Sequence, residues 1–190
     1  MLQKNLIRSK IRKNIKDLTV TERQNASQQI TKLILNKLPS DSIHIAVYWP
    51  TKYEINSIPL IEFLLINHKS CYLPVINQHT QTLNFIKYTA NTKLIKNKFG
   101  ILEPAFNAKD QILVSQLDLI FMPLVAFDSF GHRIGSGSGF YDRSIETKSN
   151  LNGKLIGLAY SIQQVANFIP DAHDVNLDFV VTEQKWLDFS

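Results

Sequence analysis

The stretch that decides the fold is "LDLIFMPLVAFDSFGHRIGSGSGFYDR", residues 117–143, in which an apolar run passes directly into a glycine-rich turn. The run 117–127 predicts a buried strand, because continuous apolar residues are typical of a strand that is covered on both faces. Gly131 is expected to adopt a positive φ in the turn that follows. Ligands of open α/β sheets bind beyond the carboxyl ends of the strands, so this turn is predicted to lie at a ligand site.

Strand-like runs and helix-like runs alternate along the rest of the chain. The other expected strands are 43–49, 71–76, 82–88, 154–161 and 177–182, and the helix-like pieces between them are 57–67, about 140–148, and 161–168. This alternation predicts the α/β class, as three α/β/α layers around a largely parallel central sheet. Residues 89–112 are polar and irregular, and we expect either a long loop or a small excursion there.

Two amphipathic helices are expected at the N-terminus. Residues 2–18 place apolar side chains at helical spacing, which predicts a helix with its basic side turned to solvent; these are Leu2, Leu6, Ile11, Ile15 and Leu18. Thr19 and Glu22 have the spacing of a capping box, so a second helix should start there and end before Pro39.

The composition favours one globular domain that spans residues 1–190. Hydrophobic residues make up 44% of the 190 residues, and no repeat or linker divides the chain. The formal net charge is +5, which favours anionic ligands. Residues 3–16 hold six basic residues and no acid, which predicts a local positive patch, although a merely lysine-rich surface is the alternative.

Several classes of protein are excluded or disfavoured by the same sequence. The single cysteine, Cys71, allows no internal disulfide and no cysteine-based zinc site, and it is expected to be a small buried hydrophobe in a reducing cytoplasm. No apolar run approaches the ~20 residues that a membrane-spanning helix needs. We expect a cytoplasmic monomer that contacts neither membrane nor nucleic acid.

The glycine-rich turn has the composition of an anion-binding loop. Gly135, Gly137 and Gly139 alternate, which leaves backbone N–H groups bare just before a helix that is expected to start at Phe140. The spacing matches neither the P-loop nor the dinucleotide fingerprint, and a flexible surface loop is the alternative. Arg133 has the chemistry to pair with a phosphate. Asp142 fits two roles equally well, a partner of the helix dipole or an Mg²⁺ ligand.

The segment "IFMPLVAFDSFGHRIGSGSGFYDR" (120–143) closely resembles the signature of the 5-formyltetrahydrofolate cyclo-ligases. Four shorter segments are similar to that family in order and spacing: "KNLIR" (4–8), "VYWPTKYEINS" (47–57), "FGILEP" (99–104) and "IPDAHDVNLDFVVT" (169–182). The resemblance runs from Lys4 to Thr182. It has one departure, since Ser136 and Ser138 stand where the family commonly has a basic residue or another glycine. The resemblance implies a fold like that of the NagB/RpiA/CoA-transferase group. It also implies a reaction of 5-formyltetrahydrofolate with ATP and Mg²⁺ that gives 5,10-methenyltetrahydrofolate, ADP and phosphate.

The same resemblance implies roles for individual residues. ATP would be bound by Lys4, Arg8, Arg133, Ile134, Gly135, Ser136, Gly137, Ser138, Gly139, Phe140 and Tyr141. Folate would be bound by Trp49, Glu54, Phe99, Gly137, Gly139 and Tyr141. Arg133 and Tyr141 would be catalytic, and Asp142 and Asp174 would hold Mg²⁺.

Other interpretations of these residues remain open from the sequence alone. Without the resemblance, Lys4 and Arg8 are typical of a solvated basic face, Glu54 of an exposed loop acid and Phe99 of a core residue. His173 is interpreted as an exposed loop histidine without a catalytic role. A sugar-phosphate isomerase or acyl-CoA-transferase-like enzyme with Glu54 as its base is one alternative function. Nucleic-acid binding through the basic first helix is another. Replacing Asp142 by Asn is expected to leave stability nearly unchanged.

Overall fold

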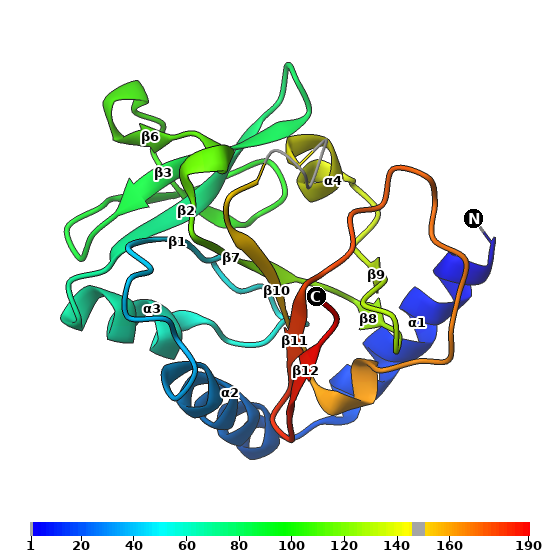
Figure 1. Cartoon of the computed structure of the whole chain (residues 1–190). Helices are drawn as coiled ribbons and strands as arrows, with labels where there is room; N and C mark the ends of the chain where they lie inside the picture. Colours follow the sequence, from blue (N-terminus) through cyan, green and yellow to red (C-terminus); the bar gives the residue numbers. More distant parts are fainter. Residues whose placement is uncertain (1, 146–150) are drawn as a thin grey trace.

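The computed structural model describes residues 2–145 and 151–190. Within these residues an eight-stranded sheet crosses the molecule in the order β12-β11-β10-β7-β1-β2-β3-β6 (Figure 1). Its strands are β1 (His44–Ala46), β2 (Ser70–Asn77), β3 (Thr82–Tyr88), β6 (Gln111–Ile112), β7 (Leu119–Pro123), β10 (Lys154–Leu158), β11 (Phe179–Val181) and β12 (Trp186–Asp188). The strands from β11 to β2 pair in parallel, whereas β3, β6 and β12 pair antiparallel at the two edges. The expected α/β class with a largely parallel sheet is confirmed.

The strand order reverses between β1 and β7. From β1 the chain builds the sheet outward through β2, β3 and β6, and from β7 it builds outward in the other direction through β10, β11 and β12. Ile45 of β1 is in register with Leu119 of β7, so the carboxyl ends of these two strands lie at the same edge. A reversal of this kind opens a crevice in α/β sheets. The segments that leave β1 and β7 are therefore placed to line a ligand site.

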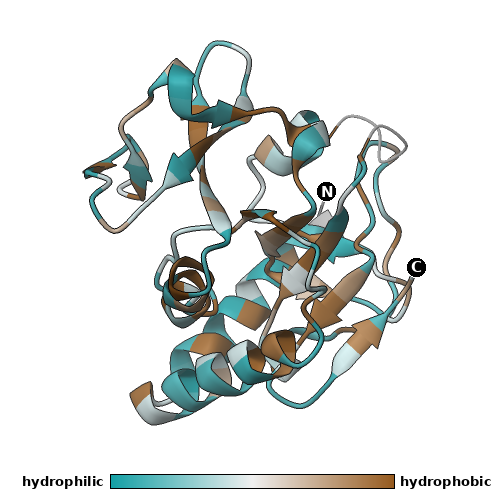
Figure 2. Ribbon diagram, turned by 60° about the vertical axis from the view of Figure 1, so that its left-hand side comes forward, coloured by the Kyte–Doolittle hydropathy of each residue, from teal (hydrophilic) through white to brown (hydrophobic). Residues whose placement is uncertain are grey.

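Three helices cover one face of the sheet. They are α1 (Leu2–Asp17), α2 (Val20–Leu35) and α3 (Ile58–Ile66), and their inner side chains share one core with β1, β2 and β7. Figure 2 shows the hydrophobic strands at the centre and helices that alternate hydrophobic and hydrophilic residues. The opposite face is covered mostly by loops. The described residues on that face include one short α-helix, α4 (Phe140–Ser144). The second covering layer is therefore much less helical than the first.

The two N-terminal helices form as expected, with one correction. Thr19 accepts from the N–H of Glu22 at 3.2 Å and Glu22 accepts from the N–H of Thr19 at 2.7 Å, so the predicted capping box is confirmed. The prediction that the basic side of α1 faces solvent is wrong for Lys4, of which only 9% is exposed. Acidic residues of the loop before β11 pack against Lys4 and remove it from water.

The apolar run 117–127 forms two strands rather than one. β7 ends at Pro123, and β8 (Ala126–Phe127) pairs with β9 (Arg133–Ile134) in a separate hairpin. Pro123 has no N–H to donate to the sheet, and the chain after it pairs with β9 instead, so the strand breaks there. The carboxylate of Asp128 accepts from the N–H groups of Phe130 and His132 in the hairpin turn. Gly131 has φ +80°, so its expected positive φ is confirmed.

The remaining differences concern short elements. The stretch 89–112 is a small excursion rather than a long loop, because it contains the hairpin of β4 (Leu94–Lys96) and β5 (Leu102–Pro104) as well as β6. The helix expected at 161–168 is only a 3₁₀ turn, Ser161–Gln163. The helix expected at 140–148 is α4 up to Ser144, and residues 146–150 lie outside the described residues. Among the described helices, none combines the length and apolar character needed to cross a membrane.

Candidate active site

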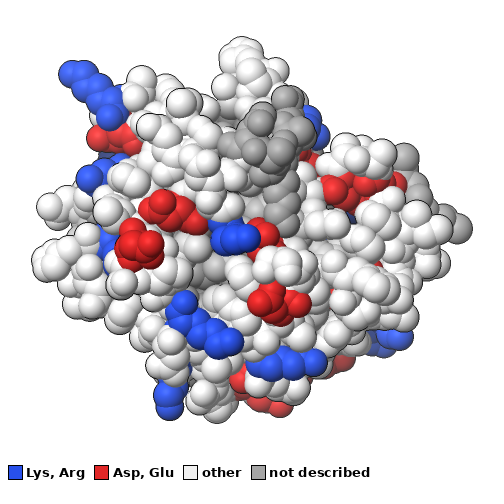
Figure 3. Space-filling model, viewed as in Figure 1, with Lys and Arg blue, Asp and Glu red and all other residues white. Residues whose placement is uncertain are grey.

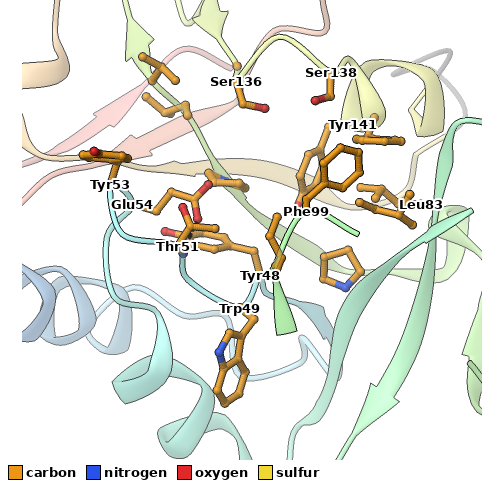
Figure 4. A pocket seen from close by; sticks show the side chains of 18 of the residues that line it. Tyr48, Trp49, Thr51, Tyr53, Glu54, Leu83, Phe99, Ser136, Ser138 and Tyr141 are labelled. Atoms are coloured by element: carbon orange, nitrogen blue, oxygen red, sulfur yellow. Dashed lines mark hydrogen bonds between the residues drawn. The ribbon is translucent and has the colours of Figure 1, made fainter. Parts of the chain in front are cut away.

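Two neighbouring pockets lie at the carboxyl ends of β1 and β7. The first, here called the inner pocket, has a volume of about 320 Å³ and is lined by residues 48–54, the β4–β5 hairpin and the glycine-rich loop (Figure 4). The second, here called the basic cleft, is more open, with about 870 Å³, and is lined by α1, the same loop and the segment before β11. Residues of the glycine-rich loop form part of both walls. The turn that was predicted to lie at a ligand site therefore lies between two pockets.

Aromatic side chains form much of the wall of the inner pocket. Tyr48 and Tyr53 come from the segment after β1, and Phe140 and Tyr141 come from the start of α4. Phe99 reaches the pocket from the β4–β5 hairpin and contacts Phe140 edge-on, with 6.0 Å between the ring centroids. Phe99 is 52% exposed, so it lies at the mouth of the pocket and not in the core. Such walls suit a flat ring system.

Glu54 places a carboxylate among these rings. Its Oε2 atom accepts a hydrogen bond from the N–H of Thr51 at 2.8 Å, and burial raises the pKa of the carboxyl above its ordinary value. Burial also raises the pKa of the Tyr141 hydroxyl well above its ordinary range, and the charge of Glu54 adds to this increase. Tyr141 is therefore a neutral hydrogen-bond donor at neutral pH, and Glu54 is an acceptor whose charge costs free energy in this environment.

A buried ion pair closes the pocket beside the glycine-rich loop. An Nη atom of Arg133 lies 2.5 Å from Oδ1 of Asp142, and the side chains are 4% and 13% exposed. The Nε atom of Arg133 is buried and has no hydrogen-bond partner among the described residues. The N–H of Val175 donates to Oδ1 of Asp142 at 3.3 Å, which joins α4 to the segment before β11.

The loop between β9 and α4 presents its backbone to both pockets. Gly137 has φ +112° and Gly139, the residue just before α4, has φ +66°. The amide N–H groups of residues 135–139 donate to no backbone oxygen of the described residues. Backbone N–H groups without an acceptor, on a turn that leads into a helix, form a concave set of hydrogen-bond donors that can bind an anion. Ser136 and Ser138 lie at the same end of the inner pocket (Figure 4).

The basic cleft is held together by contacts between the two ends of the chain. Nζ of Lys4 lies 2.8 Å from Asp171 and 2.6 Å from Asp174. Burial alone would lower the pKa of Lys4, but the hydrogen bonds to the two aspartates raise it above its ordinary value. Arg8 donates from Nε to the carbonyl oxygen of Gly135 at 2.9 Å. The first helix is thereby attached to the glycine-rich loop and to the segment before β11.

The structure brings most of the predicted site residues together. Glu54, Phe99, Arg133, Tyr141 and Asp142 line the inner pocket, and Lys4 and Arg8 line the basic cleft. Trp49 lies at the end of the pocket away from Ser136 and Ser138, with its ring edge against Tyr88 at 6.0 Å between centroids (Figure 4).

Two predicted residues have an environment that the sequence did not suggest. The side chain of Ile134 is buried in the core, so only its backbone is available to a ligand. Asp174 already pairs with Lys4, which was predicted to bind phosphate.

Glu103, Arg12 and Tyr53 are among the pocket residues that the sequence analysis did not identify as site residues. Glu103 lines the inner pocket and accepts from the side-chain amide of Asn97 at 2.9 Å, and its signal was its place in "FGILEP". Arg12 and Tyr53 line both pockets. The signal for Arg12 was its position one helical turn after Arg8, on the same face of α1.

The net positive charge does not form a broad positive surface on the face seen in Figure 1. Figure 3 shows that Lys and Arg side chains on this face are interspersed with Asp and Glu side chains. Asp171 of the basic cleft and the nearby Asp174 likewise pair with Lys4 and offset part of the charge of α1. The cleft is therefore suited to an anion whose charge is offset by a few nearby cations of α1, and not by a broad positive surface.

Comparison with known proteins gives consistent results. A sequence model of the "5-formyltetrahydrofolate cyclo-ligase family" matches residues 1–183. The chain is 39% identical over 173 residues to the 5-formyltetrahydrofolate cyclo-ligase of Haemophilus influenzae, covering 90% of this chain and 92% of that protein. It is 33% identical to the 5-formyltetrahydrofolate cyclo-ligase of Escherichia coli K12, covering 92% and 97%. The solved structure of 5,10-methenyltetrahydrofolate synthetase from Aquifex aeolicus superposes with a TM-score of 0.84 at 30% identity, covering 100% of this chain and 93% of that one.

Proposed function

The chain belongs to the 5-formyltetrahydrofolate cyclo-ligase family, and from this premise we propose that it converts 5-formyltetrahydrofolate and ATP into 5,10-methenyltetrahydrofolate, ADP and phosphate. One observation carries the proposal beyond family membership. An aromatic pocket with a half-buried carboxylate adjoins a basic cleft at a loop of bare amides. A reaction that transfers a phosphoryl group from a nucleotide to a flat heterocyclic substrate needs two such subsites side by side.

The inner pocket is the proposed folate subsite. Its rings offer flat faces to a pterin, and Glu54 is placed to accept hydrogen bonds from pterin N–H groups. Phe99 at the mouth and Trp49 at the far end bound the subsite. Tyr141, which stays protonated, is placed to donate a hydrogen bond to an oxygen of the substrate.

The basic cleft and the glycine-rich loop form the proposed ATP subsite. The backbone N–H groups of residues 135–139, which have no backbone acceptor among the described residues, are proposed to donate hydrogen bonds to phosphate oxygens. Lys4 and Arg8 add positive charge from α1. Arg133 is the proposed cation beside the transferred phosphoryl group, since its guanidinium lines the inner pocket next to the loop. The unsatisfied Nε atom of Arg133 is a donor that no described residue uses.

The residues of the proposed metal site fit an Mg²⁺ ion. Asp142 and Asp174 each use one oxygen in hydrogen bonds, Oδ1 and Oδ2 respectively. For the other oxygen of each carboxylate, no partner is recorded among the described residues. Mg²⁺ binds one or two carboxylates together with phosphate oxygens. Asp142 and Asp174 would hold the ion, and the ion would offset phosphate charge.

The proposed chemistry has two steps. The formyl oxygen attacks the γ-phosphorus, the bond to the leaving oxygen of ADP breaks, and an activated phosphate ester of the formyl group results. The N10 atom then attacks the formyl carbon, the ring closes with loss of the N10 proton, and the C–O bond to phosphate breaks. The protein contributes mainly by positioning the two substrates and by offsetting charge on the transferred group.

The test is a spectroscopic assay with purified protein. With 5-formyltetrahydrofolate, ATP and Mg²⁺, we expect the near-ultraviolet absorbance of the methenyl product to develop, and with ATP omitted we expect none. Formation of the product at the same rate without ATP would contradict the proposed mechanism. No product from folded protein and intact substrates would contradict the proposed function itself.

A further inference from the structure

Arg12 occupies the junction of the two proposed subsites. It lines the inner pocket and also the basic cleft, a position that it shares with Tyr53 and Ser136. Arg8 and Arg12 are one helical turn apart, so both project from the same face of α1 toward the glycine-rich loop. The place where the two pockets adjoin is where a group passing from one ligand to the other must lie.

The three cations assigned to ATP in the proposed function already have partners in the protein, and two further cations, Lys13 and Lys16, line the basic cleft but not the inner pocket. Lys4 is held by Asp171 and Asp174, and Arg133 is held by Asp142. Arg8 donates to the carbonyl of Gly135 and to the side chain of Asn5. For Arg12, no acceptor and no acidic partner is recorded in the part of the chain that the structure describes. Its side chain is exposed at the junction, with the five N–H donors of the guanidinium available to a ligand.

The loop opposite Arg12 offers donors without formal charge. Ser136 shares the junction, and Ser138 lines the inner pocket beside it. Hydroxyls donate hydrogen bonds to phosphate oxygens, but they neutralise no charge. A terminal phosphate held between this loop and α1 would therefore need a nearby cation that is not already neutralised. A guanidinium matches two phosphate oxygens at once.

We infer that Arg12 binds the terminal phosphate of ATP and holds it at the junction for transfer to the folate substrate. The inference rests on the proposed function. It assigns Arg12 to the γ-phosphate, and not to the α- and β-phosphates or to the carboxylates of the folate tail. Binding of ATP should then depend on Arg12, whereas binding of ADP should not.

The experiment compares Arg12→Ala and Arg12→Lys with Lys10→Ala. Lys10 is an exposed residue of the same helix that lines neither pocket, so it controls for the loss of one charge from α1. Affinities for ADP and for a non-hydrolysable ATP analogue are measured by titration calorimetry in the presence of Mg²⁺, and kcat and the folate KM are measured separately. Circular dichroism and thermal unfolding report whether each variant is folded.

For Arg12→Ala we expect the affinity for the ATP analogue to fall about 10- to 100-fold, as for loss of a hydrogen-bonded charge, with ADP affinity and folate KM nearly unchanged. Arg12→Lys should recover part of the affinity, and Lys10→Ala should behave like the wild type. Equal losses for ADP and the ATP analogue would overturn the assignment to the terminal phosphate. A raised folate KM with unchanged nucleotide binding would assign Arg12 to the folate tail, and no effect at all would leave it a solvated side chain. A wild-type protein that binds nucleotide but forms no methenyl product would overturn the proposed function and leave this comparison informative.

Discussion

At the scale of single residues, the buried pair of Arg133 and Asp142 gives the clearest expectation. Asp142→Asn leaves a 4% exposed guanidinium without its counter-charge. The sequence alone suggested that this change would leave stability nearly unaltered. Because the structure buries the pair, we instead expect a loss of roughly 1.5–3 kcal/mol of unfolding free energy together with a loss of activity. Urea denaturation measures the first, and the absorbance assay measures the second.

The matched control for that change is Asp41→Asn, which makes the same chemical change at an exposed carboxylate. It should change stability by less than about 0.5 kcal/mol, as is usual for surface substitutions. An Asp142→Asn variant as stable as Asp41→Asn would show that Arg133 finds another partner or reaches water. That result would contradict the interpretation of the pair as a buried structural element of the site.

Glu54 should make folate binding depend on pH. Burial raises the pKa of Glu54 in the free protein, so near that pKa a fraction of the protein carries a protonated carboxyl. Pterin N–H donors favour the ionised form, so binding releases a proton, and affinity should rise with pH until the raised pKa is passed. Below the raised pKa the affinity should fall by up to about tenfold per pH unit. Titration of 5-formyltetrahydrofolate into the protein at a series of pH values measures this slope.

Glu54→Gln is the comparison for the pH series. It keeps the shape of the side chain but does not titrate, so its affinity should be lower by about 10- to 100-fold at neutral pH and flat as the pH falls. A wild-type slope that persists in Glu54→Gln would assign the titration to another group. Affinity unaffected by the substitution would remove Glu54 from the folate subsite.

At the scale of elements, the loop between β9 and α4 depends on the conformation of Gly137. A φ of +112° is strained for any residue with a Cβ. The guanidinium carbon of Arg8, on the first helix, lies 3.8 Å from the position that a Cβ of residue 137 would take. Because the loop is exposed, Gly137→Ala should shift the loop locally rather than unfold the protein. A strain of about 1–3 kcal/mol corresponds to a loss of about 5- to 150-fold in nucleotide affinity. Calorimetric titration with ATP and Mg²⁺ measures the loss.

Gly135→Ala is the comparator for this loop, since Gly135 has no positive φ and a Cβ there would meet Arg133 at an ordinary 3.5 Å. It should lower nucleotide affinity less than Gly137→Ala does. Equal losses in the two variants would mean that the added methyl group, and not the backbone conformation, determines the effect.

The elements that could be predicted from the sequence are those with a strong local pattern. The capping box of α2, the amphipathic α1 and the central strands followed from residue spacing and apolar runs. β4, β8, β9 and β12 have two or three residues each, which is too short for a period to be recognised. The break after Pro123 depended on pairing with β9, which lies beyond a turn and has only two residues.

The site could be predicted only in part, because some of its features depend on contacts between residues that are far apart in the sequence. The glycine-rich loop and Glu54 were identified from composition, position and family resemblance, because each lies in the segment that follows a central strand, β7 and β1 respectively. The burial of Lys4 could not be identified, because it depends on Asp171 and Asp174, more than 160 residues away in the chain. Arg12 looked like any other member of a basic helix until the two pockets on either side of it were visible.

At the scale of the whole molecule, the two pockets join different parts of the chain. The basic cleft brings together α1, the glycine-rich loop and residues 171–173, whereas the inner pocket brings together residues 48–54 and the β4–β5 hairpin with the same loop. In Figure 1, α1 runs beside β8 and β9, on the side away from β2 and β3. Each ligand should therefore stabilise its own set of segments, with the loop common to both.

Amide hydrogen exchange followed by mass spectrometry measures these footprints, because a ligand that binds the native state suppresses local opening. ATP with Mg²⁺ should slow exchange in α1, in residues 135–141 and in residues 171–175, although α1 and the last segment are far apart in sequence. 5-Formyltetrahydrofolate alone should slow exchange in residues 48–54 and in the β4–β5 hairpin, and also in the loop. Segments remote from both pockets, such as the solvent side of α2, should change little and serve as the internal control. If nucleotide protected the β4–β5 hairpin and left α1 unchanged, the assignment of the two subsites would be reversed, because α1 contributes most of the cations of the basic cleft and that hairpin contributes none of its lining residues.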